Sequence, residues 1–214
     1  MEVMPYQHGV DVVGPTTWTG APLTGWRAKL PVLRATGVSL RELQQSDAAS
    51  LHSRLTTEQV ARFISPPPTT VDAFADFIRW SHIRRAEGKY VCFGIVPDGC
   101  DAAVGIFQIQ LRTHETPEWG FVLGSEFWGT GVFVEGAVAL MDFAFNVIGL
   151  ERLAARAAVD NGRGNGALRK IGAVRESLIP NGLVHRGRLY DQYYWTSTPE
   201  DRPRRKITWD LAAH

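Results

Sequence analysis

Hydrophobic residues along the chain recur with two periods, one typical of helices and the other of strands. The spacing of apolar residues between positions 72 and 87 predicts a helix that ends at Gly88. Positions 132–148 predict a longer and more apolar helix. A further helix is expected to begin near position 47, with Ser46 or Asp47 as its cap.

Shorter apolar runs predict strands at 38–43, 89–97, 102–111, 117–123, 152–159 and 188–197. The turn "DGCD" joins the second and third of these runs, which indicates a hairpin. The order is a strand, helices, several consecutive strands, a helix, a strand, a helix and a final strand. This order predicts an α/β protein of the α+β kind, in which helices flank a mixed sheet.

The apolar run from 132 to 150 is long enough to raise the question of a membrane span. Glu135, Asp142 and Asn146 fall on one narrow stripe of that helix, which is typical of a buried helix with one solvated edge. We therefore expect no membrane partner.

Composition narrows the function classes. The 214 residues carry a formal net charge of +1 and are 44% hydrophobic, which predicts one domain and argues against nucleic acid as a partner. Cys92 and Cys100 form no CxxC pair, and the first residues show no signal peptide, so we expect reduced thiols and a cytoplasmic location, with a single disulfide between the two as the alternative. The expected organisation is an irregular arm at 1–30, a domain at 31–198 and a tail at 199–214.

Two glycines, Gly129 and Gly131, stand directly before the helix predicted at 132–148. The first amides of a helix lack partners within the helix, and residues without a Cβ let a phosphate approach them. A tight turn without any ligand fits the local sequence equally well. The lysine and hydroxyl of a P-loop are absent here, and Val134 stands where a dinucleotide fingerprint has its third glycine.

Three motifs together resemble the GCN5-related N-acetyltransferases, in particular the branch of ribosomal-protein N-terminal acetyltransferases. They are "GFVL…FWGTGVFVEGA", the "DN" pair at Asp160–Asn161, and "LRKIGA" at 168–173. The resemblance spans about residues 36–197. It implies a mostly antiparallel sheet of six or seven strands, whose middle two strands splay apart around the pantetheine arm of an acyl-CoA.

The resemblance also implies the cofactor contacts, with acetyl-CoA as the default co-substrate. The residues that would line the pyrophosphate are Trp128, Gly129, Thr130, Gly131, Val132 and Phe133. Main-chain groups of Phe121, Val122 and Leu123 would meet the pantetheine, and Asn161 would bond the cofactor amide region. Glu126 stands where relatives often carry Arg or Gln, so its carboxylate should point away from the phosphates. Leu168 replaces the tyrosine that many relatives use as a general acid.

For the catalytic base we favour Glu118, at the start of the strand that leads to the loop, although a solvated strand-end glutamate is an equal alternative. Glu115 is a weaker candidate, and Glu135 fits a structural role near the helix dipole. The general acid stays open among Tyr190, Tyr193, Tyr194 and His185. The scattered histidines imply no metal.

The sequence thus predicts a CoA-dependent N-acyltransferase whose acceptor is a small-molecule amine or a peptide N-terminus. One rival is a catalytically silent acyl-CoA sensor. Another is an enzyme for a bulkier donor such as succinyl-CoA, whose carboxylate could meet Arg112, Arg163, Arg186 or Arg188. The oligomeric state is left open, with a homodimer as one option.

Overall fold

A computed structural model describes residues 25–112, 115–201, 203 and 207–210 of the chain. Within these residues, nine strands form a single sheet in the order β7-β8-β6-β5-β4-β3-β2-β1-β9. The strands are β1 (Val32–Ala35), β2 (Val38–Glu42), β3 (Tyr90–Pro97), β4 (Gly105–Gln110), β5 (Glu118–Leu123), β6 (Leu153–Ala158), β7 (Val174–His185), β8 (Arg188–Ser197) and β9 (Thr208–Asp210). The helices are α1 (Gly25–Ala28), α2 (Asp47–Leu55), α3 (Glu58–Ala61), α4 (Val71–Ala86), α5 (Val132–Phe143) and α6 (Gly162–Lys170).

The sheet is antiparallel except at its centre. β5 and β6 run parallel, and their pairing is confined to Glu118 opposite Ala154. β5 pairs with β4 over its whole length, from Glu118 opposite Gln110 to Leu123 opposite Gly105. The two central strands therefore meet at their first residues and diverge toward their carboxyl ends, as the sequence analysis expects.

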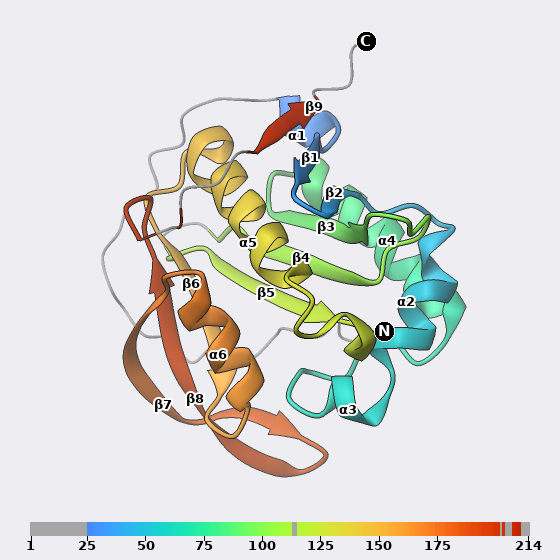
Figure 1. Cartoon of the computed structure of the whole chain (residues 1–214). Coiled ribbons are helices and arrows are strands. Elements are labelled where there is room, and N and C mark those ends of the chain that lie inside the picture. Colours follow the sequence, from blue (N-terminus) through green and yellow to red (C-terminus); the bar gives the residue numbers. More distant parts are fainter. Residues whose placement is uncertain (1–24, 113–114, 202, 204–206, 211–214) are drawn as a thin grey trace.

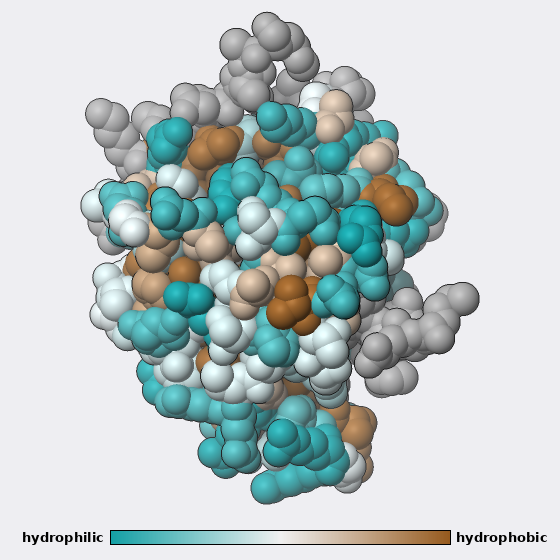
Figure 2. Space-filling model, turned by 90° about the vertical axis from the view of Figure 1, so that its right-hand side faces the viewer, coloured by the Kyte–Doolittle hydropathy of each residue, from teal (hydrophilic) through white to brown (hydrophobic). Residues whose placement is uncertain are grey.

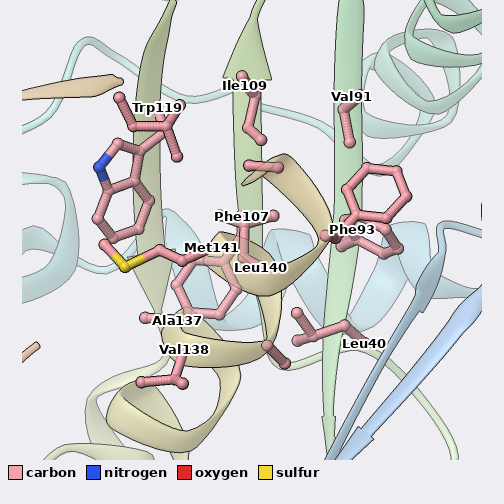
Figure 3. Close-up of a cluster of buried hydrophobic side chains, with 14 of the residues drawn as sticks. Leu40, Val91, Phe93, Phe107, Ile109, Trp119, Ala137, Val138, Leu140 and Met141 are labelled. Carbon is pink, nitrogen blue, oxygen red and sulfur yellow. The ribbon is translucent and has the colours of Figure 1, made fainter. Parts of the chain in front are cut away.

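Helices cover both faces of this sheet (Figure 1). On one face, α5 packs across β1 to β5, and alternate residues of β3 and β4 supply Val91, Phe93, Phe107 and Ile109 to that core. Figure 3 shows these side chains meeting Leu140 and Met141 of α5. The intervening residues, such as Cys92 and Ile106, point to the other face, where they pack against α2 and α4. Because helices bury both faces of β3 and β4, residues that point either way are mostly apolar, and the two strands form continuous apolar runs in the sequence.

The helix boundaries follow local chemistry. The Thr70 hydroxyl caps α4 by accepting the Ala73 N–H at 3.1 Å, and Gly88, at a φ of 72°, ends the helix region. After Phe143, α5 continues as a π-helical turn over Ala144–Ile148. No helix in the described part of the chain has the length and apolarity to cross a membrane.

The cap predicted for α2 is confirmed in its position but not in its side-chain bond. Ser46 occupies the cap position but forms no side-chain cap bond. Asp47 is fully buried, and its carboxylate instead accepts the main-chain N–H groups of Gln44 and Ala103, at 2.7 and 2.8 Å, and pairs with Arg41. The carboxylate therefore ties the start of α2 to the turn before β4.

Three strands are not predicted by the sequence. β1 and β9 are short, and β7 contains Pro180 and two shifts in its register with β8. Proline removes a ladder donor, which an edge strand such as β7 tolerates. β9 lies in the segment predicted as a tail and pairs with β1. Residues 1–24 of the predicted arm lie outside the described residues, whereas Trp26 and Leu30 are buried in the core beside α5.

Candidate functional site

The divergence of β5 and β6 opens a cavity of about 1390 Å³ beside the glycine loop. This volume exceeds the range of about 300–1,000 Å³ that is usual for sites of drug-sized ligands. Its walls come from the end of β5, the loop and first turn of α5, the start of α6, the segment from α3 to Ile64, and the turn between β7 and β8. Such a cavity has room for a large, extended ligand together with a second, smaller one.

The glycine loop gives the cavity a wall of main-chain amides. Gly129 and Gly131 have φ of 80° and 93°, in the left-handed region, and a Cβ built on either would meet nothing within 4 Å. Gly131 is the N-cap of α5 and has no side chain with which to cap the helix. The Thr130 hydroxyl turns back and donates to the Phe127 carbonyl at 2.8 Å. Neither the N-cap residue nor the Thr130 hydroxyl thus accepts from the first amides of α5, and the helix dipole favours an anion at this point.

Trp128 fixes the loop in place. Its indole N–H donates to the Leu123 carbonyl at 2.9 Å, which ties the loop to the end of β5. The Arg163 guanidinium of α6 lies over the Trp128 ring, 4.0 Å from its centroid. A cation is thereby held at the edge of the amide wall.

Asn161 lies at the cavity and begins α6. Its side-chain oxygen accepts the Gly164 N–H at 2.8 Å, and within the described residues its side-chain nitrogen donates no hydrogen bond. The three glycines of α6 therefore do not prevent a helix, because Asn161 caps it. Asn165 adds hydrogen bonds from its side chain to the carbonyls of Ala158 and Asn161, both at 2.9 Å.

Most residues predicted for the cofactor lie together. Those that line the cavity are Phe121, Val122, Leu123, Trp128, Gly129, Gly131, Phe133 and Asn161. Thr130 and Val132 do not line it: Thr130 is exposed and turned toward Phe127, and the Val132 side chain is buried in the core. Glu126 forms an ion pair with Arg54 at 2.8 Å and is not among the lining residues, which agrees with the expectation that its carboxylate points away.

Glu118 lies outside the cavity lining, where β5 and β6 still pair. It is three residues from Phe121, or about 10 Å along the strand. Its carboxylate lies 3.2 Å from Nε of Arg156. Burial raises the pKa of Glu118 above its ordinary value, although the charges of Arg156 and Arg112 oppose this shift.

Of the candidate acids, Tyr194 is the one brought to Glu118. Tyr194 on β8 is the direct partner of Arg156 on β6, so the two side chains share a face of the sheet. Burial, and after it the Glu118 charge, raises the pKa of the Tyr194 phenol. Tyr193 lies on the opposite face, with Arg175 over its ring, and Tyr190 and His185 line the cavity.

One wall of the cavity is not predicted by the sequence. The segment Glu58–Ile64 contacts the turn between β7 and β8, and the ring nitrogen Nδ1 of His185 lies 3.1 Å from the Ile64 carbonyl oxygen. Phe63 and Tyr190 meet edge to face, with centroids 6.0 Å apart. More than 120 residues separate the two partners along the chain, so no local pattern could have indicated this contact.

The chain resembles known proteins in sequence and in fold. Residues 38–174 match the family described as "Acetyltransferase (GNAT) domain". The chain is 25% identical over 162 residues to the uncharacterised N-acetyltransferase p20 of Bacillus licheniformis, which covers 74% of this chain and 91% of that protein. It superposes on Mycobacterium smegmatis RimJ in complex with CoA-disulfide with a TM-score of 0.72 and 23% identity, over 85% of this chain and 92% of that one. It also superposes on the microcin C7 self-immunity acetyltransferase MccE in complex with acetyl-CoA and AMP, with a TM-score of 0.67 and 18% identity, over 76% and 93% of the two chains.

Proposed function

Because the chain belongs to the GNAT acetyltransferase family and is an acyltransferase, we propose that it transfers an acetyl group from acetyl-CoA to a primary amine. The amine attacks the thioester directly while both substrates are bound. The observation that carries the proposal is the shared cavity, into which both the uncapped amides of α5 and the divergent edge of β5 open.

The residues present fit a CoA thioester. The amides at the start of α5 suit its diphosphate, and Arg163 and Lys170 of α6 add positive charge on the same side of the cavity. Every second residue of β5 directs its main-chain N–H and C=O groups toward β6. Beyond Glu118 the two strands no longer pair, so β6 does not bond these groups. Half-buried main-chain groups need partners, and the amides of a pantetheine arm supply them. The Asn161 side-chain nitrogen is a further donor.

The chemistry requires a neutral amine and a stabilised oxyanion. A main-chain N–H of β5 that faces the split can donate to the oxyanion. Glu118 is the proposed base, and its raised pKa suits the removal of a proton near neutral pH. Because Glu118 lies at the closed end of the split, it would receive the proton through water. Tyr194, beside it, is the proposed donor to the departing thiolate.

The test is the release of free thiol from acetyl-CoA with a panel of amines and of peptides that differ at the N-terminus. We expect release that depends on the amine and a mass increase of one acetyl group on the acceptor. Binding of acetyl-CoA without thiol release from any amine would instead identify a sensor. A higher turnover with succinyl-CoA would change the donor but keep the reaction class. Absence of acetyl-CoA binding by calorimetry would overturn the proposal.

A further inference from the structure

Four side chains stack against one another along the cavity wall formed by the segment after α3 and the β7–β8 hairpin. The Arg62 guanidinium lies over the Phe63 ring, 5.0 Å from its centroid, and the Arg188 guanidinium lies over the Tyr190 ring at 4.8 Å. The two rings meet edge to face. We call this set the Arg–aromatic cluster, and all four of its members line the cavity.

The fold of the β7–β8 hairpin brings Arg188 to this place. Arg186 and Gly187 both have positive φ, 50° and 75°, which makes a tight turn between the paired residues His185 and Arg188. A left-handed backbone at a non-glycine residue is costly and persists only where the surroundings hold it. His185 is buried against the Ile64 carbonyl, and this contact holds the turn on the segment after α3.

Both arginines of the cluster are free to bind a ligand. Within the described residues, neither Arg62 nor Arg188 forms an ion pair, although other arginines of the chain do. A guanidinium that stacks flat on a ring keeps its in-plane N–H groups available, and these match the geometry of a carboxylate or a phosphate. The lower end of the molecule, where Figure 1 places α3 and the hairpin, is mainly hydrophilic in Figure 2.

The cavity carries its positive side chains in two places, beside the glycine loop and around the Arg–aromatic cluster. Its lining contains five cations, Arg62, Arg163, Lys170, Arg186 and Arg188, against the two carboxylates of Glu58 and Asp160. Arg163 and Lys170 belong to α6, and Arg163 is held over the loop residue Trp128. Arg186 pairs with Glu58 at 3.7 Å. Arg62 and Arg188 belong neither to α6 nor to an ion pair among the described residues, so they are the cations to consider for the second substrate.

We propose that the Arg–aromatic cluster selects acceptors that carry an acid group, a carboxylate or a phosphate, close to the amine that is acetylated. This inference rests on the proposed function of the site and names its acceptor class. An amine without such a group leaves the two guanidinium groups without an anionic partner. A neighbouring acid group docks on them, which leaves the amine to face the thioester.

The experiment compares pairs of acceptors that differ in the acid group alone: glutamate with glutamine, O-phosphoethanolamine with ethanolamine, and peptides that begin with Glu or Gln. Thiol release from acetyl-CoA gives kcat/KM for each member. We expect about a tenfold or greater preference for the acid member of at least one pair, as bonds between charged groups supply. The pairs also separate carboxylate from phosphate recognition.

Variants assign the preference to the cluster. Arg62→Gln and Arg188→Gln should lose the preference by raising the acceptor KM, with the KM for acetyl-CoA unchanged, and Arg62→Lys should recover part of it. Arg84→Gln is the control, because it removes a half-buried arginine of α4 that pairs with Glu87 and does not line the cavity. Arg163→Gln should raise the KM for acetyl-CoA without changing the acceptor preference.

Three results would overturn the inference. Equal kcat/KM within every pair would show that the acid group is not read, while the acetyltransferase activity itself would stand. If Arg62→Gln raises the KM for acetyl-CoA alone, the cluster belongs to the donor. The same holds if the wild type turns over succinyl-CoA faster than acetyl-CoA and Arg62→Gln does not. Absence of thiol release with these pairs and with the whole amine panel, in a protein that binds acetyl-CoA, would refute the proposed function and this inference with it.

Discussion

The glycine loop allows a test that separates backbone strain from ligand binding. In Gly131→Ala, the added Cβ meets nothing within 4 Å, so no collision contributes to the cost. The cost comes from the φ of 93°, because an L residue in the left-handed region loses about 1–2 kcal/mol. For a chain of this length, each kcal/mol corresponds to about 2–4 °C in Tm.

Gly37→Ala provides the matched control. Gly37 has a φ of 73°, and a Cβ added there would also meet nothing within 4 Å, but this residue lies in the turn between β1 and β2 and does not line the cavity. Its substitution should lower Tm by a similar amount. The two variants therefore share the backbone penalty and differ in their distance from the ligand.

Only Gly131→Ala should weaken acetyl-CoA binding. A methyl group at this position stands where the phosphates approach the amides, and the loss of one charge-assisted hydrogen bond costs about 1.5–3 kcal/mol. We expect Kd to rise by about tenfold or more in calorimetry, and the thermal stabilisation by excess acetyl-CoA to fall accordingly. If both variants lose stability but keep the affinity of the wild type, the amides of α5 do not bind the diphosphate.

Four further predictions concern the base (two of them), a buried carboxylate and the core. Because burial raises the pKa of Glu118, the acidic limb of the pH–rate profile should lie above pH 4.5. Arg156→Gln should move this limb to higher pH, because it removes a charge that lowers the pKa. An unchanged profile in Glu118→Gln would exclude Glu118 as the base. The same raised pKa means that protonated Glu118 stabilises the fold below pH 4.5 and that this contribution is lost as pH rises through the folded-state pKa, so denaturant titrations of Glu118→Gln should lack it. Burial alone would raise the pKa of Asp47, but hydrogen bonds from Arg41 and two main-chain amides hold this pKa below its ordinary value. Asp47→Ala should therefore lower the free energy of unfolding in urea by about 3–5 kcal/mol near pH 7, and by less as pH falls through the folded-state pKa. A loss below about 1 kcal/mol would contradict the role of these bonds. Leu140→Ala, at a fully buried position, should cost about 2.7–5 kcal/mol, and a loss near zero would mean that α5 does not pack as described.

The periodic segments of the sequence were enough to place most elements. The helix at 72–87 and the strands at 89–97, 117–123 and 152–159 agree with the structure to within a residue or two. Their signals are local, because the pattern of each segment reflects the face that it buries. β7 was missed because Pro180 and two register shifts interrupt its alternation, and only pairing with β8 holds it as a strand.

The site was predictable where it depends on main-chain amides. Glycines before an apolar helix are visible in the sequence, and the motifs around them carry the family resemblance. By contrast, the sequence did not show that Glu118 meets Arg156 and Tyr194, since the three residues come from three strands of the sheet. The Arg–aromatic cluster was equally hidden, because its halves are distant along the chain and meet only when the hairpin turns onto the segment after α3.

The sequence by itself determined the continuous apolar runs of β3 and β4, the apolar α5 and the glycines before it, because each depends on residues within a few positions of one another. Tertiary structure alone decided where β5 and β6 diverge, which carboxylate is buried beside which cation, and which arginines of the described chain remain unpaired at the cavity. Burial and charge pairing are set by whatever lies opposite a residue in space, and in this sheet the opposite residue usually belongs to a strand far away along the chain.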